Sequence, residues 1–143
     1  MSLEENKAIV RRLFEAENER NLALLDELMA PDYVDHPRQF KGLVSYKQYL
    51  TMLYKSFPDT HEVIEGIIAE GDKVCIHLKG TATHTGEYRG LAPSGKKTKW
   101  ESIVIWRIVN GKIVEMLTAV SDELDFLKQL GVIEYKGFPD EAK

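Results

Sequence analysis

The hydrophobic residues of the first part of the chain recur at the spacing of amphipathic helices. Residues 2–20 form the first such segment, and a capping box of Ser2 and Glu5 marks its start. A second, short helix is predicted over residues 21–29. A third is predicted over residues 45–57, where tyrosine, leucine and phenylalanine side chains form a continuous stripe. The N-terminal part of the chain is therefore predicted to be helical.

After residue 59 the hydrophobic pattern changes to the alternation that is typical of strands. Two strands are predicted within residues 60–86, and a long hairpin over residues 98–120. The hairpin turns at Asn110-Gly111, a pair that tolerates positive φ at both positions. A loop rich in glycine and proline lies between these two units, and a short helix is predicted over residues 122–132.

The order of the predicted elements indicates the fold class. Helices come first, antiparallel strands follow, and helices segregated from an antiparallel sheet are typical of α+β proteins. We expect a single domain over residues 1–143, in which a strongly curved sheet covers one layer of helices. Because a curved sheet has a concave face, we also expect a pocket for a small molecule between the sheet and the helices.

Composition narrows the classes of protein to consider. The chain has 143 residues, of which 43% are hydrophobic and 29% charged, as in a globular domain. Its net charge of −4 argues against a nucleic-acid partner, which would favour a basic surface. We see no apolar run that suits a membrane span or a signal peptide. Cys75 is the single cysteine, so no internal disulfide is expected and the cytoplasm is the expected location.

Asp122 lies where the last predicted strand meets the closing helix, and it allows two interpretations. Aspartate is a common N-cap residue at the start of a helix. Alternatively, its carboxylate faces the pocket, because Asp122 shares a face with Met116 and Val120 if no bulge interrupts the strand. A carboxyl group there would be partly desolvated, which would raise its pKa and suit it to proton transfer near neutral pH.

Histidines are a second set of candidates. His36 follows a short extended segment and precedes a proline, where it could hydrogen-bond an enolate or carbonyl oxygen, or bond the backbone of its own loop. His77 alternates with apolar residues beside Lys79, as a solvent-facing side chain would, and His84 begins the loop after the second strand. None of them shows the spacing of metal ligands, so we expect no metal.

One acid and several aromatic residues are candidates for the pocket wall. Glu101 interrupts an apolar strand between Trp100 and Trp106, and the alternation of the strand does not decide which face is inward. Phosphate-binding loops and the serine nucleophile elbow have no counterpart in the sequence. The candidate pocket residues are Tyr33, Tyr49, Tyr54, His84, Trp100 and Glu101.

Six short segments, spread over nearly the whole chain, form a recognisable series. They are "YVDHP" (33–37), "FPD" (57–59), "AEGDKV" (69–74), "THTGEYRGLAPSGKK" (83–97), "IWRIVNGKIVE" (105–115) and "DELDFLKQLG" (122–131). In this order they resemble the SnoaL-like polyketide cyclase (ester cyclase) family, within the superfamily of nuclear-transport-factor-like and ketosteroid-isomerase-like folds. The resemblance implies a cone-shaped α+β barrel that usually forms a homodimer.

The resemblance also implies a reaction, the intramolecular aldol ring closure of a polyketide ester without metal or cofactor. An aspartate placed like Asp122 would take a proton from an activated C–H group and return one, and His36 would be a second polar group of the pocket. A positioned carboxylate and a dry pocket suffice for such chemistry. The tryptophan that the family has after Glu115 is absent here, and the segment before Asp122 is one residue longer, so we expect a bulge or a longer helix entry.

We therefore predict a cofactor-independent enzyme that acts by proton transfer on a small apolar carbonyl or ester compound, with Asp122 and His36 as catalytic residues. The alternatives are a non-catalytic dimeric domain that binds a small hydrophobic ligand, or a hydrolase, dehydratase or isomerase on the same fold. A pocket without an acid of raised pKa would favour the binding domain. Residues 103–106 and 113–116 of the hairpin are candidate homodimer contacts, and Trp106 would then belong to the interface.

Overall fold

The computed structural model describes residues 2–134, which form helices and one six-stranded sheet. The first half of the chain holds α1 (Leu3–Asn18), the 3-10 helix η1 (Leu22–Leu24), α2 (Leu25–Leu28), β1 (Met29–Asp35), β2 (Phe40–Lys41) and α3 (Leu43–Ser56). The second half holds β3 (His61–Glu70), β4 (Lys73–Thr83), β5 (Lys97–Val109), β6 (Lys112–Ser121) and α4 (Glu123–Gln129). The α+β class predicted from the sequence is confirmed.

Helix α1 forms as its sequence predicts. The side chain of Ser2 accepts a hydrogen bond from the backbone N–H of Glu5 at 3.1 Å, which caps the first turn. The apolar face of the helix, with Val10 and Leu13 fully buried, packs toward the sheet. Its polar face stays in water, so burial of one stripe fixes the orientation of the helix.

The sheet has the order β2-β1-β6-β5-β4-β3. Strands β3 to β6 are antiparallel neighbours, as the hairpin signals predict. Strand β1, in contrast, pairs with β6 in parallel, with Val34 opposite Glu115 and Asp35 opposite Met116. The expectation of a purely antiparallel sheet is therefore wrong, and the brief extended segment that the sequence indicated before Pro37 belongs to a strand inside a mixed sheet.

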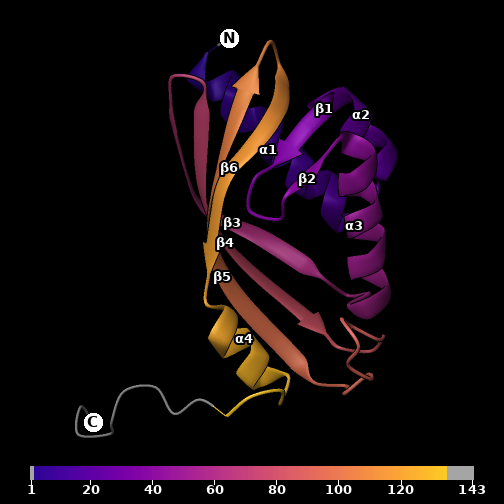
Figure 1. Ribbon diagram of the computed structural model, residues 1–143. Coiled ribbons are helices and arrows are strands. Elements are labelled where there is room, and N and C mark those ends of the chain that lie inside the picture. The colour runs from indigo at the N-terminus through magenta and orange to yellow at the C-terminus, as the bar shows by residue number, and fades with distance from the viewer. Residues whose placement is uncertain (1, 135–143) are drawn as a thin grey trace, which may run out of the picture.

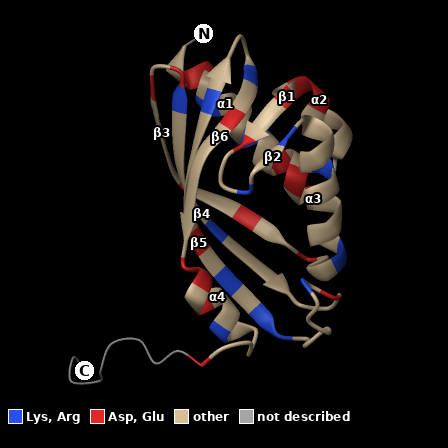
Figure 2. Cartoon of the chain, in the orientation of Figure 1, with Lys and Arg blue, Asp and Glu red and all other residues tan. Residues whose placement is uncertain are grey.

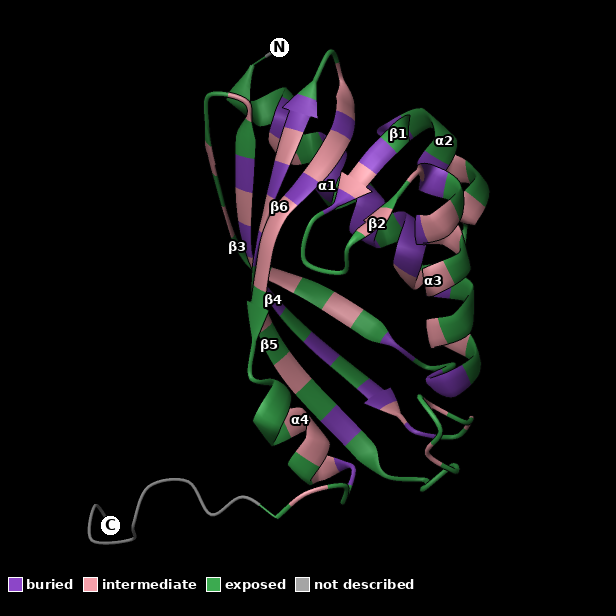
Figure 3. Ribbon diagram, in the orientation of Figure 1, coloured by how far each residue is buried: buried purple, intermediate pink, exposed green. Residues whose placement is uncertain are grey.

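The elements form two layers around one core. Figure 1 shows α1, α2 and α3 gathered on one side of the bent sheet, with α4 attached at the end of β6. Along β4 and β5, buried positions alternate with exposed or half-buried ones (Figure 3), so one face of these strands points to the helices. Basic and acidic residues are interspersed along the strands and helices that Figure 2 displays. No helix within residues 2–134 is long and apolar enough to cross a membrane.

Strand β6 contains the irregularity that the longer segment before Asp122 predicted. Its register against β5 shifts between the pairs Ile105–Thr118 and Trp106–Met116, which leaves Leu117 as an extra residue. The bulge reverses the alternation beyond it, so Val120 is 63% exposed. The interpretation in which Met116, Val120 and Asp122 share one face required a strand without a bulge, and it is wrong.

Candidate active site

A cavity of about 340 Å³ lies between helices α1 and α3 and the concave face of the sheet. Residues from β4, β5 and β6 form its floor, and Phe126 of α4 contributes to one end. Most of its wall is apolar, which favours a ligand with a hydrophobic body. The aromatic residues of this wall are Phe14, Tyr46, Tyr49, Phe57, Tyr88, Trp100, Trp106 and Phe126.

Glu17 is a buried carboxyl group in this apolar cavity. Only 5% of the residue is exposed, and its Oε1 accepts a hydrogen bond from the hydroxyl of Tyr46 at 2.5 Å. Burial, reinforced by the negative charge of Glu62, raises the pKa of Glu17 to about 8, although the Tyr46 bond acts in the opposite direction. Glu17 is therefore mostly protonated at neutral pH and can donate a proton or a hydrogen bond.

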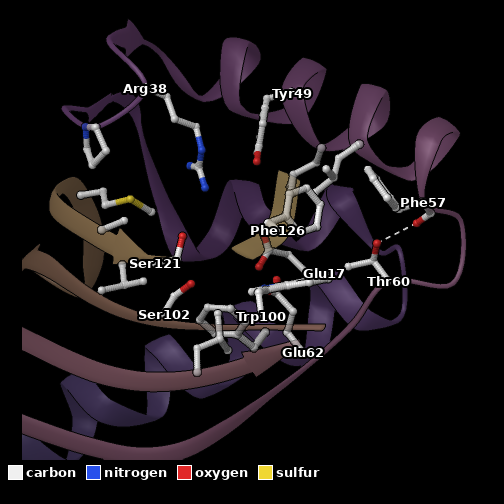
Figure 4. A pocket seen from close by; sticks show the side chains of 18 of the residues that line it. Glu17, Arg38, Tyr49, Phe57, Thr60, Glu62, Trp100, Ser102, Ser121 and Phe126 are labelled. Atoms are coloured by element: carbon white, nitrogen blue, oxygen red, sulfur yellow. Dashed lines mark hydrogen bonds between the residues drawn. The ribbon is translucent and has the colours of Figure 1, made fainter. Parts of the chain in front are cut away.

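Glu62 on β3 is the second carboxyl group of the cavity wall (Figure 4). Burial raises its pKa, and the indole N–H of Trp100, which donates to Glu62 Oε2 at 3.1 Å, opposes the rise. The indole reaches Glu62 by lying across Gly80, its register partner on β4. A Cβ atom at Gly80 would lie 2.2 Å from Trp100 Cε2, so this part of the wall requires glycine at that position.

Arg38 brings a positive charge to the same cavity. Its Nη1 donates to Asp35 Oδ2 at 2.6 Å, and its backbone N–H donates to Asp35 Oδ1 at 2.9 Å. Asp35 is fully buried and also accepts a hydrogen bond from the hydroxyl of Tyr33 at 3.1 Å. The guanidinium lies 4.3 Å from the ring centroid of Tyr49. These contacts hold Arg38 so that it points into the cavity (Figure 4).

Asp122 is the N-cap of α4 and also one of the residues that line the cavity. Its Oδ1 accepts the backbone N–H of Asp125 at 2.9 Å. The residue is exposed, so the expectation that it is desolvated at the end of an apolar strand is wrong. Its neighbours Ser121 and Glu123 are exposed and also line the cavity, which places all three residues where the cavity meets solvent.

His36 does not line the cavity. Half of its side chain is exposed, and its Nε2 lies 2.6 Å from Glu115 Oε2. Hydrogen bonds from His36 and from Arg107 lower the pKa of Glu115. The structure therefore places His36 at the surface, where it bonds Glu115 of β6 and does not line the cavity.

The predicted wall residues separate into two groups. Tyr49 and Trp100 line the cavity, and so does Trp106, for which the sequence left both the pocket and a dimer interface open. Glu101 points away from the cavity, where it lies 3.4 Å from His77 and 3.5 Å from Lys79.

The other three candidates lie near the cavity without lining it. Tyr33 is part of the buried core, and Tyr54 donates its hydroxyl hydrogen to the backbone carbonyl oxygen of Glu17 at 3.1 Å. His84 is 1% exposed and packs on Phe57, with its Nδ1 2.8 Å from the hydroxyl of Ser94. Within residues 2–134, no group of three or more His, Cys, Asp or Glu residues could hold a metal ion.

Sequence reasoning missed Glu17, Glu62 and Arg38. A signal for Glu17 was present, because it follows Leu13 by four positions and therefore lies on the buried face of α1. The bulge in β3 between Ile64 and Gly66 obscured the inward face that Glu62 shares. Arg38 lies in a turn, where no periodicity indicates the direction of a side chain.

The fold and cavity define a class: cone-shaped α+β proteins with a curved sheet around an internal hollow, like nuclear-transport-factor-like domains. Within this class, the model of the SnoaL-like polyketide cyclase family matches residues 7–130, and the chain belongs to that family.

Solved structures agree with this assignment. AclR from Streptomyces galilaeus, provisionally assigned as a hydroxylase, is 28% identical with a TM-score of 0.84, over 99% of this chain and 93% of that one. IdmH from Streptomyces antibioticus, provisionally assigned as a polyketide cyclase, is 29% identical with a TM-score of 0.76. The match covers 89% of this chain and 99% of IdmH. A provisionally assigned polyketide cyclase from Acidithiobacillus ferrooxidans is 26% identical with a TM-score of 0.79. The match covers 92% of this chain and 98% of that one. Curated protein sequences give no significant match.

Proposed function

We propose that the protein is a polyketide cyclase-like enzyme that transfers protons on a small apolar carbonyl or ester compound held in the cavity. The observation that carries this proposal is Glu17, a buried acid with a pKa raised to about 8, inside a mostly apolar wall. A perturbed acid in a pocket is typical of a catalytic site. Family membership supports the same chemistry.

In the proposed reaction, two carboxyl groups in different environments have different roles, one as a base and one as a hydrogen-bond donor. Asp122, in contact with water where the cavity opens, takes the proton from a C–H group between two carbonyls, as the family resemblance implies. The protonated carboxyl group of Glu17 donates a hydrogen bond to an oxygen that gains negative charge. The carbanion carbon then forms a bond to a second carbonyl carbon, and the resulting alkoxide takes up a proton, which completes an aldol ring closure without change of redox state.

Glu17 also favours this proposal over the binding domain. A pocket that only binds a hydrophobic ligand gains nothing from a buried acid, because burying a carboxyl group costs free energy. Glu17, which is buried, and Glu62, which is half-buried, line one cavity here. The cost is explained if the acid takes part in a reaction.

Proton exchange on a simple activated compound tests the proposal. Ethyl 2-methylacetoacetate has one acidic C–H between a ketone and an ester, and loss of its signal in D₂O can be followed by NMR. We expect the wild-type protein to accelerate exchange above the buffer rate, and the protein-dependent rate to fall as pH rises through about 8, because Glu17 then loses its proton. A rate equal to that of buffer alone at every pH would contradict the proposal and favour the binding domain.

We also propose that the outer face of the sheet forms a homodimer interface. Ile103 and Val120 are opposite each other on β5 and β6 and are 44% and 63% exposed, and Ile68 on β3 is 70% exposed. Apolar residues exposed together on a sheet favour association.

Replacing Ile103 with Lys places a charge in this proposed interface, so we expect the variant to elute as a monomer and the wild type as a dimer. The measurement is size-exclusion chromatography with light scattering. Val44→Lys is the matched control, because Val44 is 71% exposed on α3. A monomeric wild type at micromolar concentration would contradict the proposed dimer.

A further inference from the structure

Arg38 is the one cationic side chain among the described residues that line the cavity. A third of the side chain is exposed, and the rest is covered by the protein. Its charge lies in the same cavity as Glu17 and Glu62. The cavity is therefore electrically asymmetric, with carboxyl groups contributed by α1, β3 and the start of α4 and a guanidinium contributed by the turn after β1.

The contacts of Arg38 fix its position but leave hydrogen-bonding capacity. Asp35 accepts from Nη1 and from the backbone N–H, and among the described residues no acceptor is bonded to Nη2 or Nε. The ring of Tyr49 supports one face of the guanidinium. Because its position is set before any ligand arrives, little side-chain entropy would be lost on binding.

A second donor without a partner lines the same cavity. The indole N–H of Trp106 has no acceptor among the described residues, although Trp106 is 1% exposed. A buried N–H without a partner costs free energy in the empty protein. A ligand oxygen in the cavity would supply the missing acceptor.

We infer that Arg38, with Trp106 as a second donor, binds the delocalised oxyanion of an enolised 1,3-dicarbonyl compound. The planar guanidinium can donate two parallel hydrogen bonds, and such an enolate carries its charge on two oxygens in one plane. Arg38 is thus the residue that selects enolic acids over neutral ketones and esters of the same size. The inference deepens the proposed function, and it rests on that proposal in taking the cavity as the substrate site.

Binding of a matched pair of probes tests the inference. 4-Hydroxycoumarin is a cyclic 1,3-dicarbonyl compound whose enol is ionised at neutral pH, whereas coumarin has the same rings and no enol. By isothermal titration calorimetry, we expect the wild type to bind 4-hydroxycoumarin about tenfold more tightly than coumarin. We expect Arg38→Gln to lose about tenfold in affinity for 4-hydroxycoumarin and to keep its affinity for coumarin. Arg11→Gln, an equal change of charge on the exposed face of α1, should leave both affinities unchanged.

Each adverse result has a defined meaning. Equal affinity of the wild type for the two probes, no binding of 4-hydroxycoumarin, or unchanged enolate affinity in Arg38→Gln would overturn the inference. Since Arg38→Gln leaves the buried Asp35 without its cation and can fail to fold, the double variant Asp35→Asn, Arg38→Gln removes both charges together and is expected to show the same loss. The comparison of probes in the wild type needs no variant. Absence of proton exchange with intact enolate selectivity would refute the proposed enzyme and leave the Arg38 site standing.

Discussion

Replacing Glu17 with Gln is expected to remove most of the pH dependence of the unfolding free energy between about pH 5 and pH 8. In the folded protein the pKa of Glu17 is raised from 4.5 to about 8, mainly by burial. The folded state therefore holds a proton that the unfolded chain has released. The stability from this group is fully present below pH 4.5 and is lost as pH rises through about 8.

The size of this effect is large for a single side chain. Because the pKa of Glu17 is raised from 4.5 to about 8, the unfolding free energy is expected to fall by about 5 kcal/mol between these two pH values. Glutamine has nearly the shape of glutamate and can accept the Tyr46 hydrogen bond through its amide oxygen, but it does not ionise. The variant should therefore be less sensitive to alkaline pH than the wild type.

Urea unfolding at several pH values between 5 and 9 measures the difference. Glu15→Gln is the matched control, since Glu15 is exposed on the same helix and its replacement should leave the pH dependence as in the wild type. A wild-type unfolding free energy that does not change with pH, or an equal slope in Glu17→Gln, would show that Glu17 is ionised throughout and would remove the acid from the proposed mechanism.

Replacing Asp122 with Asn is expected to lower the proton-exchange rate by about 10²- to 10⁴-fold, the usual contribution of a general base. Folding should be almost unaffected, because asparagine caps a helix as well as aspartate does, and the amide oxygen can still accept the N–H of Asp125. The variant thus separates the two interpretations of Asp122, as a helix cap and as a base.

The exchange assay and the unfolding free energy are measured together for this variant. Asp125→Asn is the control, because Asp125 is an exposed acid of the same helix that does not line the cavity. If Asp122→Asn keeps the wild-type rate, Asp122 is only a cap, and the base of the proposed reaction would have to be another carboxyl group of the wall, Glu62 or Glu123.

The periodicity of the sequence was sufficient to predict most of the fold. Apolar spacing indicated α1, α3 and the hairpin of β5 and β6, since each of these elements buries one face against the core. The pairing of β1 with β6 was not predictable, because its parallel register joins segments far apart in the chain and has no local signal. One extra residue in the family motif predicted either a bulge or a longer helix entry, and only the structure shows that a bulge lies at Leu117 and reverses the alternation.

The candidate site was predicted less well, for a physical reason. The family motif indicated Asp122, and the apolar and aromatic pattern indicated Tyr49 and Trp100; all three residues line the cavity. Glu17 and Arg38 depend on packing, since the pKa of Glu17 follows from its burial and the direction of Arg38 from its bonds to Asp35. Burial and side-chain direction are properties of the assembled protein, so charged residues of a cavity are easily overlooked in a sequence.

The parallel pairing of β1 with β6 also has a consequence for how the chain reaches its native state. During synthesis β1, which ends at Asp35, emerges well before its partner strand β6, which ends at Ser121. Closing so long a loop is entropically unfavourable and slows folding. The helices before and after β1 therefore keep apolar side chains uncovered until β6 has been synthesised, which makes this stage prone to aggregation.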